Sequence, residues 1–170
     1  MEKRKNAVTM KGNPLTLLGQ PVEIGHNAPD FTVLSTALAP VKLSDTNGKV
    51  RIISVVPSID TPVCDLQTRR FNEEAGKLDG VVVLSISVDL PFALAKYCAA
   101  QGIENVQTLS DHKDLDFGLK YGFVIEELRL LSRGIVIVDK AGVIRYTEYV
   151  PEVGEHPNYD RALEAAKKLL

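Results

Sequence analysis

Residues 50–64 have the sequence VRIISVVPSIDTPVC, which joins a strand signal to a helix-start signal. The β-branched run from Val50 to Val56 stops before a proline and is typical of a central, buried strand. Thr61 suits the residue that caps a helix, and Pro62 suits the first helical position, because its missing N–H would be unpaired there anyway. Cys64 is then expected as the third residue of a helix, at the carboxyl end of the strand, where open α/β sheets bind ligands.

A second buried strand is expected at residues 81–88, VVVLSISV, because parallel sheets bury such near-continuous apolar runs on both faces. A helix between the two strands completes a βαβ unit. The other expected elements are an N-terminal β-hairpin over about residues 8–18, strands at 31–34 and 41–43, helices at 91–100 and 114–121, a second hairpin of strands at 134–138 and 143–149, and a last helix from about residue 159. This order predicts a single α/β domain over residues 1–170, with a thioredoxin-like topology and a mixed central sheet flanked by helices.

Composition and charge narrow the class of protein. The chain has 170 residues, 45% of them hydrophobic, and a net charge of -2. It lacks the basic excess that neutralises a phosphate backbone, so no nucleic-acid partner is expected. Lys3, Arg4 and Lys5 are not followed by the apolar stretch of a secretory signal, and no apolar run approaches the ~20 residues of a membrane helix. We therefore expect a cytoplasmic protein with no membrane partner.

Cys64 has two interpretations. The first turn of a helix presents unpaired N–H groups and a partial positive charge, which favour a thiolate over a thiol. The thiolate is the form that attacks an electrophile. Alternatively, Cys64 is a small buried apolar residue, as free cysteines often are. The frame of Thr61 and Pro62 favours the nucleophile.

Cys98 also has two interpretations. It shares an apolar helical stripe with Leu90, Leu94 and Tyr97, so core packing is one of them. The other is a redox partner for Cys64, since a right-handed βαβ unit can place the two helices side by side. A disulfide needs Cα atoms within about 7 Å, so a larger separation would require the Cys98 helix to unwind locally.

Few other residues or motifs in the sequence suggest catalysis or metal binding. His26, His112 and His156 are scattered, and none has zinc-ligand spacing with either cysteine, so we expect no metal or other cofactor. G-x-S-x-G, Walker and G-x-G-x-x-G motifs are absent, and so is the C-x-x-C of ordinary dithiol reductases. Arg133, just before an apolar strand, is either a strand-edge charge paired with an acid or a cation close to Cys64.

The pattern Pro57-x-x-x-Thr61-x-x-Cys64 resembles the active-site motif of the peroxiredoxins. Nearly the whole chain resembles their bacterial thiol peroxidase branch, an atypical 2-Cys group, with further signatures at residues 12–14 (GNP) and 89–93 (DLPFA). The resemblance implies a thioredoxin-like fold with an N-terminal hairpin, a homodimer, a peroxide substrate and reduction by thioredoxin.

The resemblance also implies a role for each site residue. Cys64 would attack the peroxide and become a sulfenic acid, and Cys98 would condense with it to form an intramolecular disulfide. Thr61 would hold the thiolate and the peroxide, Pro57 would shield the sulfur from water, and Arg133 would polarise the O–O bond. These roles predict a thiol-dependent peroxidase.

Two alternatives stay open. The family usually carries a loop containing Gly and Pro before its arginine, whereas Glu126–Ser132 precedes Arg133 here, and this makes Arg129 a rival cation. The function also has rivals: thiol–disulfide exchange on proteins without peroxide, and a non-catalytic binding module whose cysteines are core residues.

Overall fold

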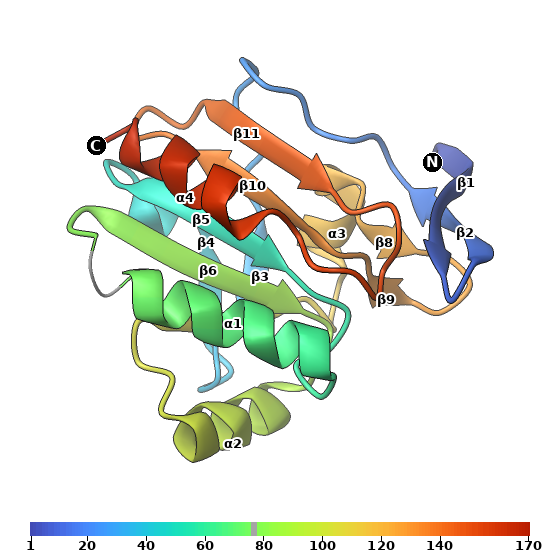
Figure 1. Ribbon diagram of the computed structural model, residues 1–170, viewed down its shortest axis with the longest axis horizontal. Coiled ribbons are helices and arrows are strands. Elements are labelled where there is room, and N and C mark those ends of the chain that lie inside the picture. Colours follow the sequence, from blue (N-terminus) through green and yellow to red (C-terminus); the bar gives the residue numbers. More distant parts are fainter. Residues whose placement is uncertain (76–77) are drawn as a thin grey trace.

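A seven-stranded mixed sheet forms the centre of the protein, as seen in a computed structural model that describes residues 1–75 and 78–170 (Figure 1). The strand order is β11-β10-β5-β6-β7-β3-β4, and β5, β6 and β7 at its centre are parallel. The bounds are β3 Thr32–Leu34, β4 Pro40–Lys42, β5 Val50–Val55, β6 Val81–Ser87, β7 Val106–Ser110, β10 Gly134–Val138 and β11 Ile144–Tyr149. The mixed α/β class predicted from the sequence is confirmed.

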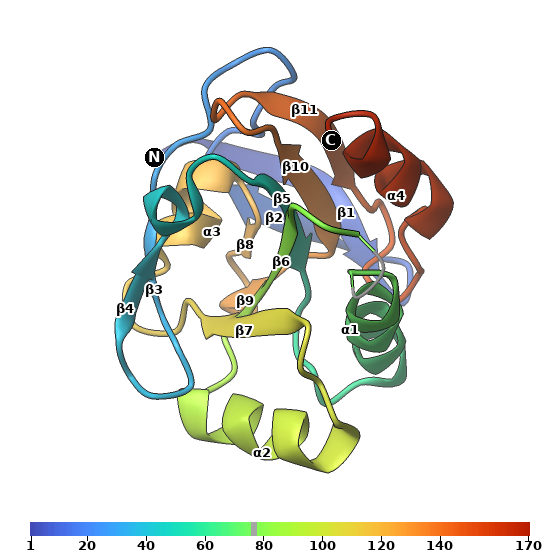
Figure 2. The ribbon, with the colours of Figure 1, turned by 90° about the vertical axis from the view of Figure 1, so that its left-hand side faces the viewer.

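Four α-helices flank this sheet: α1 (Pro62–Ala75), α2 (Pro91–Gln101), α3 (Asp116–Tyr121) and α4 (Tyr159–Lys167). In Figure 2, α1 and α4 lie on one side of the central strands and α3 on the other, while α2 lies next to β7. A short 3-10 helix, η1 (Leu43–Thr46), precedes β5. No helix in the described ranges is long and apolar enough to cross a membrane.

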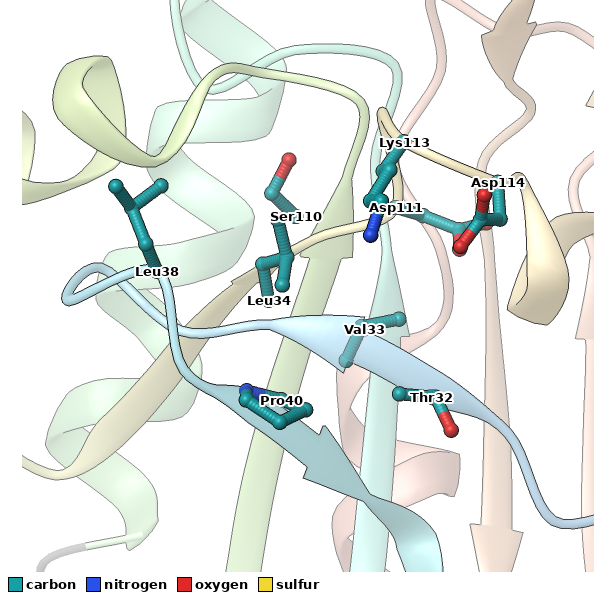
Figure 3. A pocket seen from close by; sticks show the side chains of 9 residues that line it. All are labelled: Thr32, Val33, Leu34, Leu38, Pro40, Ser110, Asp111, Lys113 and Asp114. Atoms are coloured by element: carbon teal, nitrogen blue, oxygen red, sulfur yellow. The ribbon is translucent and has the colours of Figure 1, made fainter.

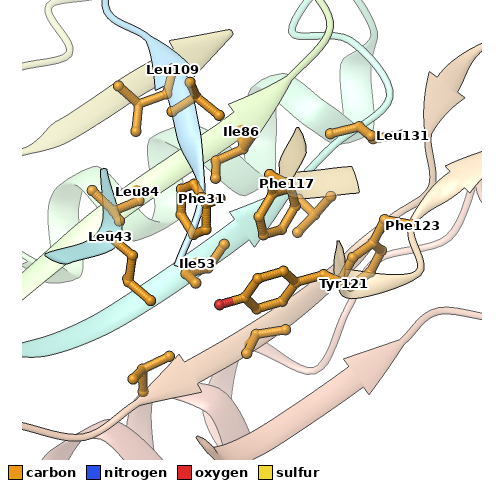
Figure 4. Packing of buried hydrophobic residues seen from close by; sticks show 14 of the residues in the cluster. Phe31, Leu43, Ile53, Leu84, Ile86, Leu109, Phe117, Tyr121, Phe123 and Leu131 are labelled. Atoms are coloured by element: carbon orange, nitrogen blue, oxygen red, sulfur yellow. The ribbon is translucent and has the colours of Figure 1, made fainter. Parts of the chain in front are cut away.

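All six residues of β5 are buried, because helices cover both faces of the sheet. Ile53 and Val55 point to the α3 side, where they join an aromatic-rich cluster that includes Phe117 (Figure 4). Val50 and Ile52 point to the other side and pack with residues of α1 and α4. This alternation fixes the register of β5, since a shift by one residue would exchange its two faces.

A smaller sheet with the order β1-β2-β8-β9 lies at one end of the molecule and contains the N-terminal hairpin (Figure 1). Its strands are β1 (Lys3–Met10), β2 (Asn13–Leu18), β8 (Val124–Ile125) and β9 (Leu130–Leu131). The predicted N-terminal hairpin is β1–β2, and it begins earlier than expected. Its two turn residues, Lys11 and Gly12, have φ values of 51° and 80°, as a tight hairpin turn with left-handed central residues requires.

The sequence did not predict three of the strands, β7, β8 and β9. The expected burial of Leu90 on the apolar stripe of α2 is also wrong, because this side chain is exposed. Leu90 precedes the first turn of α2 and caps it through its backbone, so it lies outside the face that packs on the sheet.

Candidate active site

Cys64 is the third residue of α1, as the sequence predicted, and it is completely buried. The hydroxyl oxygen of Thr61 accepts a hydrogen bond from the Cys64 amide (3.4 Å), and the Thr61 carbonyl accepts one from the Asp65 amide (2.9 Å). Thr61 therefore caps the helix, and Pro62 occupies its first position without losing a hydrogen bond. This local geometry places Cys64 beyond the carboxyl end of β5.

The guanidinium of Arg133 contacts the Cys64 sulfur. Its Nη2 donates to Sγ (3.1 Å), Nη1 donates to Oε1 of Gln67 (3.0 Å), and Nε donates to the carbonyl of Val153 (2.8 Å). The Arg133 residue is only 2% exposed, and within residues 1–75 and 78–170 it forms no ion pair with a carboxylate. A buried cation without a carboxylate partner is costly unless its N–H groups are hydrogen-bonded, and the Cys64 sulfur is one of the three acceptors that bind this guanidinium.

Gln67 is a site residue that the sequence analysis missed. Its side chain is fully buried; Nε2 donates to Oγ of Ser54 in β5 (2.8 Å), and Oε1 accepts from Arg133. It therefore helps to hold the guanidinium in contact with Sγ. Its position three residues after Cys64, on the same helix face, is the signal that could have identified it.

A cavity of about 270 Å³ opens beside this contact. Arg133 lines the cavity and also touches Cys64, so it connects the cavity to the sulfur. The remaining walls come from the N-terminal hairpin, the loop between β5 and α1, the first residues of α1 and the segment after β11: Met10, Lys11, Pro57, Thr61, Pro62, Val63, Glu152, Val153 and Gly154. Most of these side chains are apolar, which suits a small ligand with an organic group.

The structure brings Pro57, Thr61, Cys64 and Arg133 together. Pro57 is buried and Thr61 is exposed, and both line the cavity. The rival cation, Arg129, lies elsewhere: it is exposed, in the turn between β8 and β9, and its Nη2 donates to the carbonyl of His112 (3.0 Å). The geometry therefore places Arg133, and not Arg129, at the thiol.

Cys98 lies on α2 and packs in the same cluster as Phe71 of α1, which confirms that the two helices are neighbours on one side of the sheet. Its Sγ is 3.2 Å from Oγ1 of Thr108 in β7, and both cysteines are free thiols. The Tyr97 hydroxyl donates to Oδ1 of Asp65 (2.6 Å), which ties α2 to α1. Tyr97 also packs against both the cluster around Cys64 and the cluster around Cys98.

A second cavity, of about 210 Å³, lies between β3 and the segment after β7 (Figure 3). Asp111 lines it, and burial raises the pKa of this carboxyl to about 6. The carboxylate accepts from the amides of Phe117 (3.2 Å) and Gly118 (2.8 Å), so it serves the start of α3. Neither Arg133 nor Thr61, which contact Cys64, lines this cavity. The cavity beside Arg133 is therefore the better candidate for chemistry.

Among the residues that the structure describes, no three or more His, Cys, Asp or Glu side chains gather as metal ligands would. The candidate site instead consists of a thiol, a guanidinium and an apolar cavity at the edge of a mixed sheet. This combination suits redox chemistry at a thiol.

Comparisons with known proteins specify the family. Residues 23–163 match the family described as Redoxin. The thiol peroxidase of Listeria monocytogenes serotype 4b (strain F2365) is 61% identical over 161 residues, which cover 95% of this chain and 98% of the relative. That of Bacillus subtilis (strain 168) is 57% identical over 163 residues, covering 96% and 98%. The crystal structure of a peroxiredoxin-like protein from Aquifex aeolicus superposes with a TM-score of 0.91 at 38% identity, covering 97% of this chain and 98% of that one.

The chain therefore belongs to the redoxin family, in its thiol peroxidase branch, and has a thioredoxin-like fold. Membership of this branch makes it an enzyme of the peroxiredoxin type.

Proposed function

We propose that this chain reduces hydrogen peroxide and organic hydroperoxides at Cys64 and completes each turnover through a disulfide with Cys98. The observation that carries the proposal is the 3.1 Å contact between Nη2 of Arg133 and Sγ of Cys64 beside an apolar cavity. The same guanidinium that contacts the sulfur also lines the space where a peroxide would bind.

In the first step the Cys64 thiolate attacks the distal oxygen of the peroxide. The S–O bond forms as the O–O bond breaks, and the leaving alkoxide or hydroxide takes a proton to become an alcohol or water. Negative charge develops on both oxygens, and donors fixed in advance stabilise it most. Arg133 supplies such donors, Thr61 supplies a hydroxyl at the cavity wall, and the buried Pro57 shields the sulfur from water.

In the second step the Cys98 sulfur attacks the sulfenic sulfur, the S–S bond forms, and water leaves. Each thiol is held over a different part of the sheet. Cys64 contacts Arg133, which immediately precedes β10, whereas Cys98 contacts Thr108 in β7. In the central sheet, β5 and β6 lie between β10 and β7. A disulfide tolerates a Cα separation of at most about 7 Å, so we infer that α2 moves before the bond forms.

An external dithiol then reopens the disulfide, and thioredoxin is the reductant that we propose. A transient bridge of this kind suits a reducing compartment, which supports a cytoplasmic location. The largely exposed apolar side chains of Leu90 and Phe92 (69% exposed) at the start of α2 support a homodimer. A net charge of -2 supports the absence of a nucleic-acid partner. We also propose that residues 1–170 form a single domain and that the protein has no membrane partner.

Peptide mass spectrometry after one equivalent of hydrogen peroxide tests the proposed function. We expect the parent protein to form a Cys64–Cys98 disulfide. The Cys98→Ser variant should instead accumulate a sulfenic acid on Cys64, which a dimedone probe captures, because the second thiol is missing.

Other results would decide against the proposal. Two unmodified thiols in the folded parent protein would favour the binding module. A disulfide that forms with an oxidised dithiol protein but not with peroxide would favour thiol–disulfide exchange. A sulfenic acid that maps first to Cys98 would reverse the two roles.

Tyr97→Phe is expected to speed formation of the disulfide about tenfold after Cys64 has been oxidised. The variant loses the hydrogen bond from the Tyr97 hydroxyl to Asp65, whose other oxygen is paired with Arg69 (2.9 Å). A hydrogen bond to a charged group contributes roughly 1.5–3 kcal/mol, and its loss should make movement of α2 easier. Rapid-quench trapping of thiols measures the rate.

Tyr146→Phe is the matched control, because it also removes a hydroxyl bonded to a carboxylate, that of Glu148 in β11 (3.1 Å). Its disulfide should form at the parent rate. If Tyr97→Phe and the control behave alike, the contact between Tyr97 and Asp65 does not restrain α2.

A further inference from the structure

The carboxylate of Glu152, just after β11, collects hydrogen bonds from the tip of the N-terminal hairpin. Its Oε1 accepts from the hydroxyl of Thr9 (3.0 Å) and from the amide of Gly12 (3.0 Å), while Oε2 accepts from the amide of Gly154 (2.9 Å). Because backbone N–H groups favour the ionised form, they hold the pKa of Glu152 below its usual range. One carboxylate thus joins two segments that lie far apart in the sequence.

These contacts determine where one wall of the active-site cavity lies. Met10 and the turn residue Lys11 line the cavity, and so do Pro62 and Val63 at the start of α1. The hairpin lies at the end of the sheet where β11 finishes (Figure 1). The position of the wall therefore depends on how firmly the turn is attached to residues 152–154.

Two kinds of contact attach the hairpin, and they act at different places. Backbone hydrogen bonds hold the strand itself: the Thr9 amide donates to the Pro151 carbonyl, and the Val153 amide donates to the Thr9 carbonyl, each at 2.8 Å. The Glu152 carboxylate adds the contact to Gly12, at the turn. Loss of the carboxylate should therefore release the turn at Gly12. The backbone contacts would still hold Thr9 and Val153 in place, and the Val153 carbonyl would keep its hydrogen bond from Arg133.

We propose that Glu152 is a positioning residue that sets peroxide specificity, by fixing the hairpin turn as the outer wall of the active-site cavity. The organic group of a bulky hydroperoxide would pack against this wall through Met10, whereas hydrogen peroxide has no such group and would need only the inner part of the cavity beside Arg133. The inference rests on the proposed function.

Steady-state kinetics with cumene hydroperoxide and hydrogen peroxide test the inference in the full-length protein. For Glu152→Gln we expect the ratio of the two kcat/KM values, cumene hydroperoxide over hydrogen peroxide, to fall about tenfold. The change should come from a higher KM for cumene hydroperoxide rather than a lower kcat, which is the sign of lost binding. The substitution replaces one carboxylate oxygen by an NH2 group, which cannot accept a hydrogen bond, so both the charge and one acceptor are lost.

Glu155→Gln is the matched control, because Glu155 is a nearby exposed carboxylate for which the structure records no side-chain hydrogen bond within the described residues. Thr9→Val removes a single hydrogen bond to Glu152 and should move the ratio in the same direction by less. Hydrogen exchange of a peptide that contains Gly12 gives a readout besides activity, and it should speed up in Glu152→Gln but not in Glu155→Gln.

Three results would overturn the inference. The ratio could stay unchanged although Gly12 exchanges faster, which would mean that the wall does not contact the substrate. Both peroxides could lose rate equally, which would mean that Glu152 acts through Val153 on Arg133. A parent protein that fails to reduce either peroxide would overturn the proposed function along with it, so the two failures are distinguishable.

Discussion

Replacement of Cys64 by serine is expected to abolish fast peroxide consumption, with a loss on the order of 10⁴-fold or more, the scale seen when a covalent nucleophile is removed. A serine hydroxyl stays protonated at neutral pH and is a weak nucleophile. The substitution changes little else, since the introduced hydroxyl can still accept from Nη2 of Arg133 in a site that is already buried. The measurement is the rate of hydrogen peroxide loss under single-turnover conditions.

Cys98→Ser is the control for this prediction. It should consume one equivalent of peroxide at the parent rate and then stop, because only the second step needs Cys98. Thermal unfolding of both variants shows whether either loses its fold. Peroxide loss by folded Cys64→Ser at the parent rate would show that another group carries the reaction.

Much of the fold could be predicted because local and long-range preferences agree. In β5 the β-branched residues favour a strand, and burial on both faces rewards the same residues. At the start of α1, Thr61 and Pro62 define the helix boundary by themselves, so the position of Cys64 followed from sequence alone.

The missed strands show where this agreement ends. In β7 the buried residues include Thr108 and Ser110, whose hydroxyls meet Cys98 and the carbonyl of Asp89. Because other elements supply the partners of these buried hydroxyls, polar residues can occupy buried positions of β7. The sequence of β7 therefore shows only a weak apolar pattern. The two-residue strands β8 and β9 exist only because they extend the N-terminal hairpin sheet. Their sequence carries no comparable local signal.

The choice between Arg129 and Arg133 shows the same limit at the site. The two residues are four positions apart and chemically identical, so spacing cannot separate them. Arg129 has a φ of 51° in a surface turn, whereas the segment after β9 is anchored by the Ser132 amide, which donates to the Phe123 carbonyl (2.7 Å). Backbone pairing that is distant in sequence thus directs Arg133 inward.

Arg133→Met is expected to lower the rate constant for peroxide reduction by about 10²- to 10³-fold, the usual effect of removing a donor that stabilises developing negative charge. Two effects combine: less of Cys64 is present as thiolate, and the peroxide oxygens lose their cation. Met fills similar space, but it leaves Oε1 of Gln67 and the carbonyl of Val153 without their donor, so some loss of stability accompanies the loss of rate.

Two comparisons separate chemistry from stability in this variant. Arg129→Met removes an exposed arginine with one hydrogen bond, to the His112 carbonyl, and should change the rate less than about twofold. In a Cys98→Ser background, the rate of iodoacetamide alkylation at neutral pH reports the thiolate fraction of Cys64, and it should fall in Arg133→Met alone. Equal alkylation rates in both variants would mean that Arg133 acts on the peroxide and not on the thiolate. A larger loss of peroxidase activity in Arg129→Met than in Arg133→Met would instead assign Arg129 as the active-site cation.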